Sequence, residues 1–154
     1  MFNLCTGTWI SAKCTALQQL CEALKSGKAQ FRWLVLDFNS SLGDGAAMIA
    51  RAAAHNPHIQ CLSFSGCALS PKCVIDLIQA LKEGPEHSIQ FLDLARNYMD
   101  SHCVDEIINL LADPDNLIQR IDLDSLSSYC CLTASDICRL YHSCFVAHRL
   151  FAEI

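Results

Sequence analysis

The hydrophobic positions of this chain form a short phrase that recurs at a regular interval. Three segments match the pattern L-x-x-L-x-L-x-x-N, with Cys replacing Asn in the second: residues 31–39, 59–67 and 89–97. A fourth copy runs from Ile118 through Ile121 and Leu123, and Leu126 replaces the Asn there. The series Leu34, Leu62, Leu92 and Ile121 advances in steps of 28, 30 and 29 residues. Such a period indicates internal repeats, and repeats determine architecture more strongly than any single residue does.

Between these phrases, apolar residues recur at i, i+3, i+4 and i+7, which places one apolar stripe along a helix. The quartets begin at Leu17, Ala46, Val74, Val104 and Ile137. The two patterns together predict strands near 2–4, 34–36, 62–64, 92–94 and 121–123. They predict helices near 13–26, 45–55, 71–83, 101–112 and 134–148.

One short strand and one amphipathic helix cannot bury their apolar faces alone, whereas stacked units can. We therefore expect an α/β fold of the solenoid type. It should be a right-handed β-α superhelix, with a parallel sheet on the concave face and the helices on the convex face. The chain, residues 1–154, should form a single domain of roughly five units, each of roughly 28–32 residues.

The phrase and its helix resemble the leucine-rich repeat family, in its ribonuclease-inhibitor-like subclass. That subclass has repeats of this length, an outer helix, and a Cys or Asn after the strand. The resemblance extends from about Phe2 to Ile154. It implies an interaction module, and the known members include inhibitors, GTPase regulators, innate-immune sensors and bacterial effectors. The resemblance does not choose among these, because one fold hosts many functions.

Both ends of the chain look like parts of further repeats. Phe2-Asn3-Leu4 looks like a strand core, and residues 151–154 look like the opening of another phrase. A polar capping unit is visible at neither end, although stacked repeats usually need one for solubility. Three hypotheses remain open: a segment of a longer solenoid, closure by an irregular terminal turn, and self-association through the uncapped ends.

Composition narrows the classes of partner. The chain is 52% hydrophobic and carries a net charge of -5, so we expect no nucleic-acid partner. It has no apolar stretch long enough to span a membrane, and residues 1–10 lack the features of a secretory signal. We expect a protein in a reducing, cytoplasmic compartment, and an effector delivered into a host cell remains open.

The eleven cysteines follow the repeat and do not form a disulfide framework. Cys73 and Cys103 share one helix-start position, and Cys67 occupies the Asn position, where a thiol can donate weakly to loop carbonyls. We therefore expect free thiols.

The last unit holds the one metal-like cluster of the sequence: Cys130, Cys131, Cys138, His142, Cys144 and His148. Cys138 and His142 lie about 240° around a helix from Cys144 and His148, so one zinc ion cannot easily collect both pairs. We expect no metal and no cofactor. The chain also lacks the phosphate-binding and nucleophile motifs of common enzymes, so we expect that it is not an enzyme.

The predicted strands carry the candidate binding site. Side chains alternate between the faces of a strand, so the residues between the core leucines should point outward. The candidate residues are Trp33, Val35, Asp37, Phe91, Asp93, Arg96, Arg120, Asp122 and Asp124. An aromatic patch rimmed by carboxylates is typical of a face that binds a protein, here one with basic residues. The alternative is that Trp33 and Phe91 only cover neighbouring side chains while the aspartates solvate the sheet.

The sequence therefore predicts a non-enzymatic protein-protein interaction module that binds through the concave sheet face. The alternative is a structural or sensory segment of a larger regulatory, immune-sensor or bacterial effector protein. A thiol or metal enzyme is a third hypothesis, and it requires a reactive cysteine or a bound zinc. On the convex face, we expect charge changes such as Lys82→Glu to be tolerated.

Overall fold

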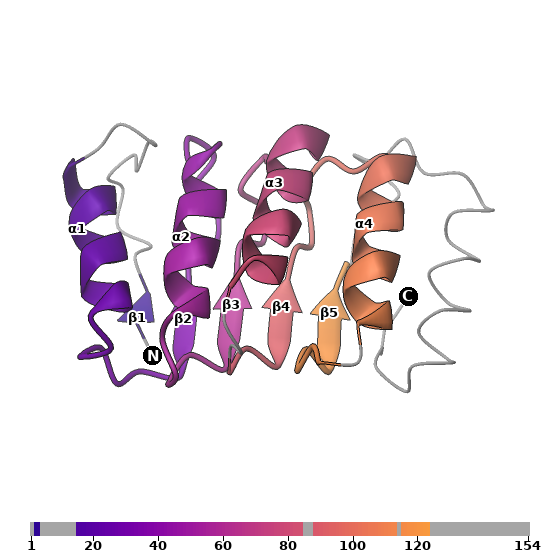
Figure 1. Ribbon diagram of the computed structural model, residues 1–154. Helices are drawn as coiled ribbons and strands as arrows, with labels where there is room; N and C mark the ends of the chain where they lie inside the picture. The colour runs from indigo at the N-terminus through magenta and orange to yellow at the C-terminus, as the bar shows by residue number, and fades with distance from the viewer. Residues whose placement is uncertain (1, 4–14, 85–87, 114, 124–154) are drawn as a thin grey trace.

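Strands and helices alternate along the chain (Figure 1). The computed structural model describes residues 2–3, 15–84, 88–113 and 115–123. The strands in this part of the chain are β1 (Phe2–Asn3), β2 (Trp33–Val35), β3 (Cys61–Ser63), β4 (Phe91–Asp93) and β5 (Arg120–Asp122). The helices are α1 (Thr15–Lys25), α2 (Gly45–Ala54), α3 (Pro71–Lys82) and α4 (Ser101–Ala112).

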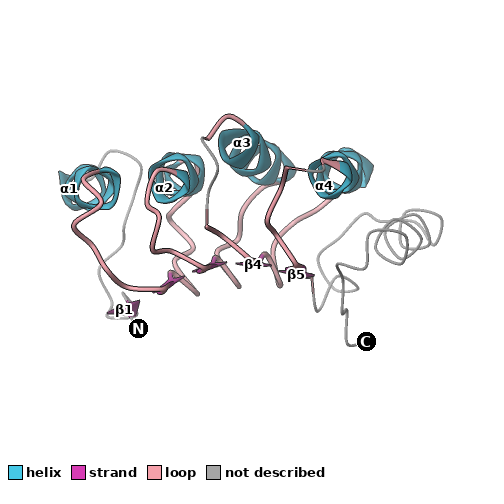
Figure 2. Cartoon of the chain, turned by 60° about the horizontal axis from the view of Figure 1, so that its bottom comes forward, coloured by secondary structure: helices cyan, strands magenta, loops and turns pink. Residues whose placement is uncertain are grey.

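The strands form one parallel sheet in the order β1-β2-β3-β4-β5. Residues at equivalent positions of the repeat pair directly, so that Leu34 lies beside Leu62, Leu62 beside Leu92, and Leu92 beside Ile121. The described helices form a second layer on one side of this sheet (Figure 2). We call the opposite side of the sheet its open face. The predicted alternation of strand and helix, and the parallel sheet, are therefore confirmed.

Each strand from β2 to β5 begins and ends one residue earlier than predicted. The main-chain hydrogen bonds give the reason. The N–H of Cys61 donates to the carbonyl of Arg32, and the N–H of Phe91 donates to that of Gln60, so the ladder starts before the first core leucine. The last apolar residue of each phrase lies just beyond the strand. Leu36, Phe64 and Leu94 nevertheless each donate an N–H to the neighbouring unit.

The four described helices lie where the apolar quartets predicted them. Two of them begin at a side-chain cap, which supplies a partner for an otherwise unpaired N–H of the first turn. The hydroxyl of Ser70 accepts from the N–H of Cys73, and the carboxylate of Asp100 accepts from the N–H of Cys103. The predicted helix at 134–148 lies outside the described residues.

The core lies between the helix layer and the sheet. Leu34, Leu62, Leu92 and Ile121 contribute from the strands and are fully buried. The helix quartets contribute the opposing surface, including Leu17, Ile49, Leu77 and Ile107. This continuous apolar layer joins neighbouring units and is the main reason that the short strands are stable.

Buried amides and one thiol satisfy the carbonyls of the loops. Asn39 donates to the carbonyl of Leu36, and Cys67, at the same repeat position, donates its thiol to that carbonyl at 3.1 Å. Asn97 follows in the next unit and is described below. The expected use of Cys at an Asn position is therefore confirmed. A second set was not predicted from the sequence: Asn56 and Asn116, in the turns after α2 and α4, donate to the carbonyls of Leu24 and Leu110 and accept from the N–H groups of His58 and Ile118.

No helix among the described residues is long and apolar enough to cross a membrane.

Candidate functional site

A row of side chains runs across the sheet at the first position of each strand. Trp33, Cys61, Phe91 and Arg120 occupy this row in register. The next residue of each strand is fully buried against the helices, so the row itself belongs to the open face. Trp33 is 53% exposed, which is a large apolar area for a surface residue. Three of these four residues, Trp33, Phe91 and Arg120, are among those that the sequence predicted to point outward.

Trp33 and Phe91 also cover the strand between them. Cys61 lies directly between these two residues in the row and is only 5% exposed. Burial, together with the carboxylates of Asp93 and Asp37, raises the pKa of the Cys61 thiol to about 11. Covering a neighbour therefore accounts for part of the aromatic area, whereas half of the Trp33 side chain still faces solvent.

Arg120 is fixed by two contacts at the end of the same row. Its guanidinium lies over the Phe91 ring, 5.1 Å from the ring centroid. The same group lies 3.5 Å from the carboxylate of Asp122, two residues along the strand. Phe91, Arg120 and Asp122 thus form one connected group on the open face.

Asp37 is bound within the protein. Its carboxylate accepts a 2.5 Å hydrogen bond from the Ser63 hydroxyl and a 3.1 Å bond from the Ser65 N–H. Both donors come from the next unit, and Ser63 is only 4% exposed. Asp37, just after β2, therefore links its unit to β3. These two hydrogen bonds already stabilise its negative charge within the protein.

Asp93 lies beside this link, in the row that also contains Val35, Ser63 and Asp122. Burial raises the pKa of the Asp93 carboxyl, and the charges of Asp122 and Asp37 raise it further. A hydrogen bond from the Ala95 N–H acts in the opposite direction. Val35 is half-buried, so it contributes less open surface than Trp33 does.

The residues that follow the strands form an exposed upper border of the open face. Phe38 and Arg96 occupy the same repeat position and have positive φ angles of 60° and 57°. Gly66 stands between them in the repeat, with φ 65°. A Cβ atom at Gly66 would lie 2.7 Å from the Phe38 ring, so the glycine makes room for this ring. Phe38 is 66% exposed.

Two predictions concerning chemistry lie wholly or partly outside the described residues. Asp124, the last candidate of the binding face, and the cysteine and histidine cluster from Cys130 to His148 both lie there. Within the described ranges, no group of three His, Cys, Asp or Glu side chains could hold a metal ion. The described cysteines are free and buried: Cys21, Cys61, Cys67, Cys73 and Cys103.

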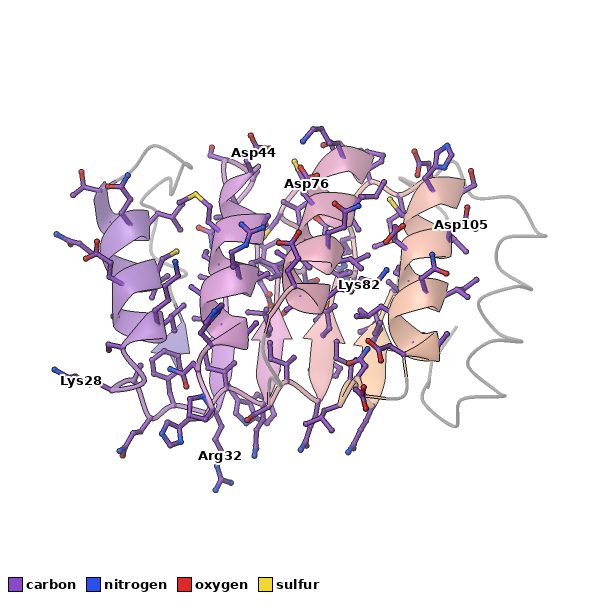
Figure 3. The ribbon with its side chains drawn as sticks, in the orientation of Figure 1. Lys28, Arg32, Asp44, Asp76, Lys82 and Asp105 are labelled. Atoms are coloured by element: carbon purple, nitrogen blue, oxygen red, sulfur yellow. The ribbon has the colours of Figure 1, made fainter. Side chains whose placement is uncertain are left out.

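A set of basic side chains that the sequence did not predict as part of the site lies at the edge where the strands begin. Lys25 ends α1, and Lys28 and Arg32 lie in the turn between α1 and β2. All three are exposed, and Figure 3 shows Lys28 and Arg32 below the helices while Asp44 and Asp76 lie at the other end. The available signal was the segment 23–36, which contains these three cations and no carboxylate.

Solved structures share this fold, among them the following two. One is described as leiomodin-1 actin-binding site 2, with a TM-score of 0.74 and 11% identity; the match covers 92% of this chain and 81% of that one. The other is the tropomodulin C-terminal domain of Caenorhabditis elegans, with a TM-score of 0.66 and 13% identity; here the coverage is 91% and 84%. No family model and no curated protein sequence matches the chain.

These comparisons correct the expected family. The assignment to the leucine-rich repeat family, in its ribonuclease-inhibitor-like subclass, is wrong, because the similar structures are leiomodin and tropomodulin domains. The phrase and the apolar quartets report how one strand packs on one helix, and this local packing does not identify a family. The first of these structures is named for the protein that it binds, and neither is named for a reaction.

Proposed function

We propose that this chain is a non-enzymatic protein-binding module and that its partner docks on the open face of the sheet. The observation that carries the proposal is Trp33, an indole that is 53% exposed on a regular sheet. Large aromatic side chains are enriched among residues that dominate binding energy, and solvent exposure of one costs free energy in the unbound protein. Phe91 and Arg120 extend the contact surface along the same row.

The proposal needs a rigid platform, and the sheet supplies one. Within the row, Cys61 and Phe91 pair with a strand on each side, Trp33 pairs with β3 and Arg120 pairs with β4. Arg120 is also held by Phe91 and Asp122. A binding face that is ordered before the partner arrives loses little conformational entropy on binding. The face includes the remaining described candidates Val35, Asp37, Asp93 and Arg96 as its surroundings, and Asp124 lies outside the described residues.

We further propose that the units wind as a right-handed superhelix, with the open face concave, and that residues 1–154 form one domain. Parallel strands joined by helices on a single side support this handedness. A concave face would surround a partner more completely than a flat one. The remaining alternative is a structural or sensory segment of a larger protein, which would have no partner on this face.

Actin is the first partner to test, because one of the similar structures is described as an actin-binding site. The direct experiment measures binding of purified monomeric actin to the wild-type chain and to Trp33→Ala/Phe91→Ala. We expect the double variant to weaken binding by about thirtyfold or more, since truncation of an aromatic anchor often costs about 2 kcal/mol or more.

Leu117→Ala is the matched control, because Leu117 is 50% exposed but precedes β5 and belongs to none of the strands that form the row. It should leave the affinity unchanged. If actin does not bind, the same three proteins are compared by crosslinking mass spectrometry in a cell lysate. Partner crosslinks confined to the helix layer would refute the open face as the site.

A further inference from the structure

We propose that Arg32, which directly precedes Trp33, and Lys28, in the turn before it, receive an acidic segment of the protein partner. The inference rests on the proposed function, and it specifies the charge of the partner. It reverses the charge preference expected from the aspartates, which called for a partner with basic residues. The reason lies in which charges of this surface are already engaged.

The cations at this edge are available for a partner. Among the described residues, Arg51, Lys72, Lys82 and Arg120 each form an ion pair. Lys25, Lys28, Arg32 and Arg96 form none within the same part of the chain. Three of these four unpaired cations thus come from a single short segment, and Arg96 lies at the opposite border.

The helix dipole explains only one of the three. Lys25 lies in the last turn of α1, where a cation is favoured by the partial negative charge of the helix end. Lys28 and Arg32 lie beyond the helix, where this effect is weak. Their position is therefore not explained by helix stability, and both side chains remain exposed to solvent.

Hydrogen bonds make this edge one continuous surface. The amide of Asn56, in the turn after α2, donates to the carbonyls of Leu24 and Ala29, at 3.0 and 3.2 Å. It also accepts from the N–H of His58. The turn that carries His55 and His58 is therefore bound to the turn that carries Lys28, and the segment 51–60 contains no carboxylate either.

The carboxylates of the open face, by contrast, are engaged. Asp37 is bonded to Ser63 and Ser65, and Asp122 is paired with Arg120. Asp93 is partly buried and accepts from the Ala95 N–H. An approaching partner therefore meets Trp33 with an unpaired cation on its chain neighbour, Arg32, and a second one, Lys28, in the preceding turn. Charge complementarity of this kind favours an acidic segment and increases its association rate.

A nucleic acid is the competing polyanion, and the surface does not favour it. The chain has a net charge of -5, and nucleic-acid affinity comes mainly from many phosphate contacts. Two or three cations beside an indole, with aspartates on the adjoining row, suit a short acidic peptide better than an extended backbone of phosphates.

The experiment measures fluorescence anisotropy with a labelled peptide of Glu, Leu and Gly. An equally long peptide with Lys in place of Glu, and a single-stranded oligonucleotide of equal charge, are the competing probes. The proteins are the wild type, Lys28→Glu, Arg32→Glu, Trp33→Ala and Lys72→Glu. Lys72→Glu changes the net charge by the same amount on the helix layer, so it is the matched control. Thermal melts verify that every variant is folded.

The expected result is binding of the Glu peptide, weakened on the order of tenfold by Arg32→Glu and by Lys28→Glu at low salt, and less at high salt. Lys72→Glu should change it by no more than about twofold, as a distant exposed charge does at moderate salt. Preference for the Lys peptide, equal or tighter binding of the oligonucleotide, no binding of the Glu peptide, or no effect of Arg32→Glu would each overturn the inference. Trp33→Ala separates the two proposals: if it weakens peptide binding while Arg32→Glu does not, the open face stands and its charge preference is wrong.

Discussion

The side-chain amide of Asn97 donates a 2.9 Å hydrogen bond to the main-chain carbonyl of Phe64, which belongs to the preceding unit. The same amide donates to the carbonyls of Leu94 and Ala95, and its oxygen accepts from the N–H of Leu69. Asn97 is buried, so these groups have no access to water. One side chain therefore satisfies the backbone of two loops.

Asn97→Ala should lower the free energy of unfolding by about 3 kcal/mol, because it leaves several buried polar groups without partners. Asn97→Cys should cost less, since Cys67 fills the equivalent position and bonds a loop carbonyl there. Urea denaturation measures both. Asn109→Ala, at an exposed position of α4, is the control. Equal stability of Asn97→Ala and Asn109→Ala would show that the loop bonds contribute little.

Asp93→Asn should raise the urea midpoint at pH 7. The pKa of Asp93 is raised in the folded protein, chiefly by burial, so the ionised form is the one that folding disfavours. The amide oxygen of Asn can still accept from the Ala95 N–H. The advantage of the variant should shrink as the pH falls, because below about pH 3.8 the wild-type carboxyl is protonated in both states.

Asp115→Asn is the control for this titration, because the Asp115 side chain is exposed. It should shift the midpoint little at either pH. A lower midpoint for Asp93→Asn at pH 7 would mean that the bonds to Ala95 and Ser63 outweigh the effect of burial.

Cys61 should make the protein less stable in alkali. Its pKa is about 11 in the folded state against 9.0 as the ordinary value, so between these values the folded protein holds a proton that the unfolded chain releases. Stability must fall as the pH rises through this window. The decline should be shallower in Cys61→Ala, while below pH 9 the two proteins should show parallel pH dependence.

The wild-type protein also tests the expectation that its cysteines are free thiols. In denaturant without reductant, all eleven cysteines should react with Ellman's reagent. Missing thiols would contradict the prediction of a reducing compartment.

Lys82→Glu should destabilise the protein by about 1 kcal/mol, contrary to the tolerance expected for the helix layer. The Lys82 ammonium lies 2.9 Å from the Glu106 carboxylate, and both side chains are partly buried between α3 and α4. The double variant Lys82→Glu/Glu106→Lys should recover most of the loss in a double-mutant cycle. Failure of the second change to restore stability would show that packing of the long lysine stem, and not its charge, is what the first change removes.

The sequence predicted correctly those features of the fold that depend only on the spacing of apolar residues. The burial of Leu34, Leu62 and Leu92 follows from alternation along a strand, and so does the row that contains Trp33 and Phe91. The predicted start of each strand from β2 to β5 was one residue late, because pairing depends on carbonyls of the preceding unit, such as that of Arg32. The apolar pattern carries no information about those carbonyls.

The candidate site was predicted less well, because its charges depend on partners in neighbouring units. The sequence around Asp37 does not show that its carboxylate accepts a hydrogen bond from Ser63, which lies 26 residues further along the chain. In the same way, the sequence does not show that the Arg120 guanidinium lies over the Phe91 ring and beside the Asp122 carboxylate. Lys28 precedes the repeated phrase and Arg32 occupies one of its variable positions, so the apolar pattern contains no information about either side chain.

The close approach of Phe38 to Gly66 has a consequence for how this surface can change over evolutionary time. Any side chain at position 66 would displace the ring at position 38, and the backbone there already requires a positive φ. The two positions should therefore covary: relatives that keep a large aromatic at 38 should keep glycine at 66. Relatives that lose the aromatic are free to place Asn there, a residue that tolerates the same backbone.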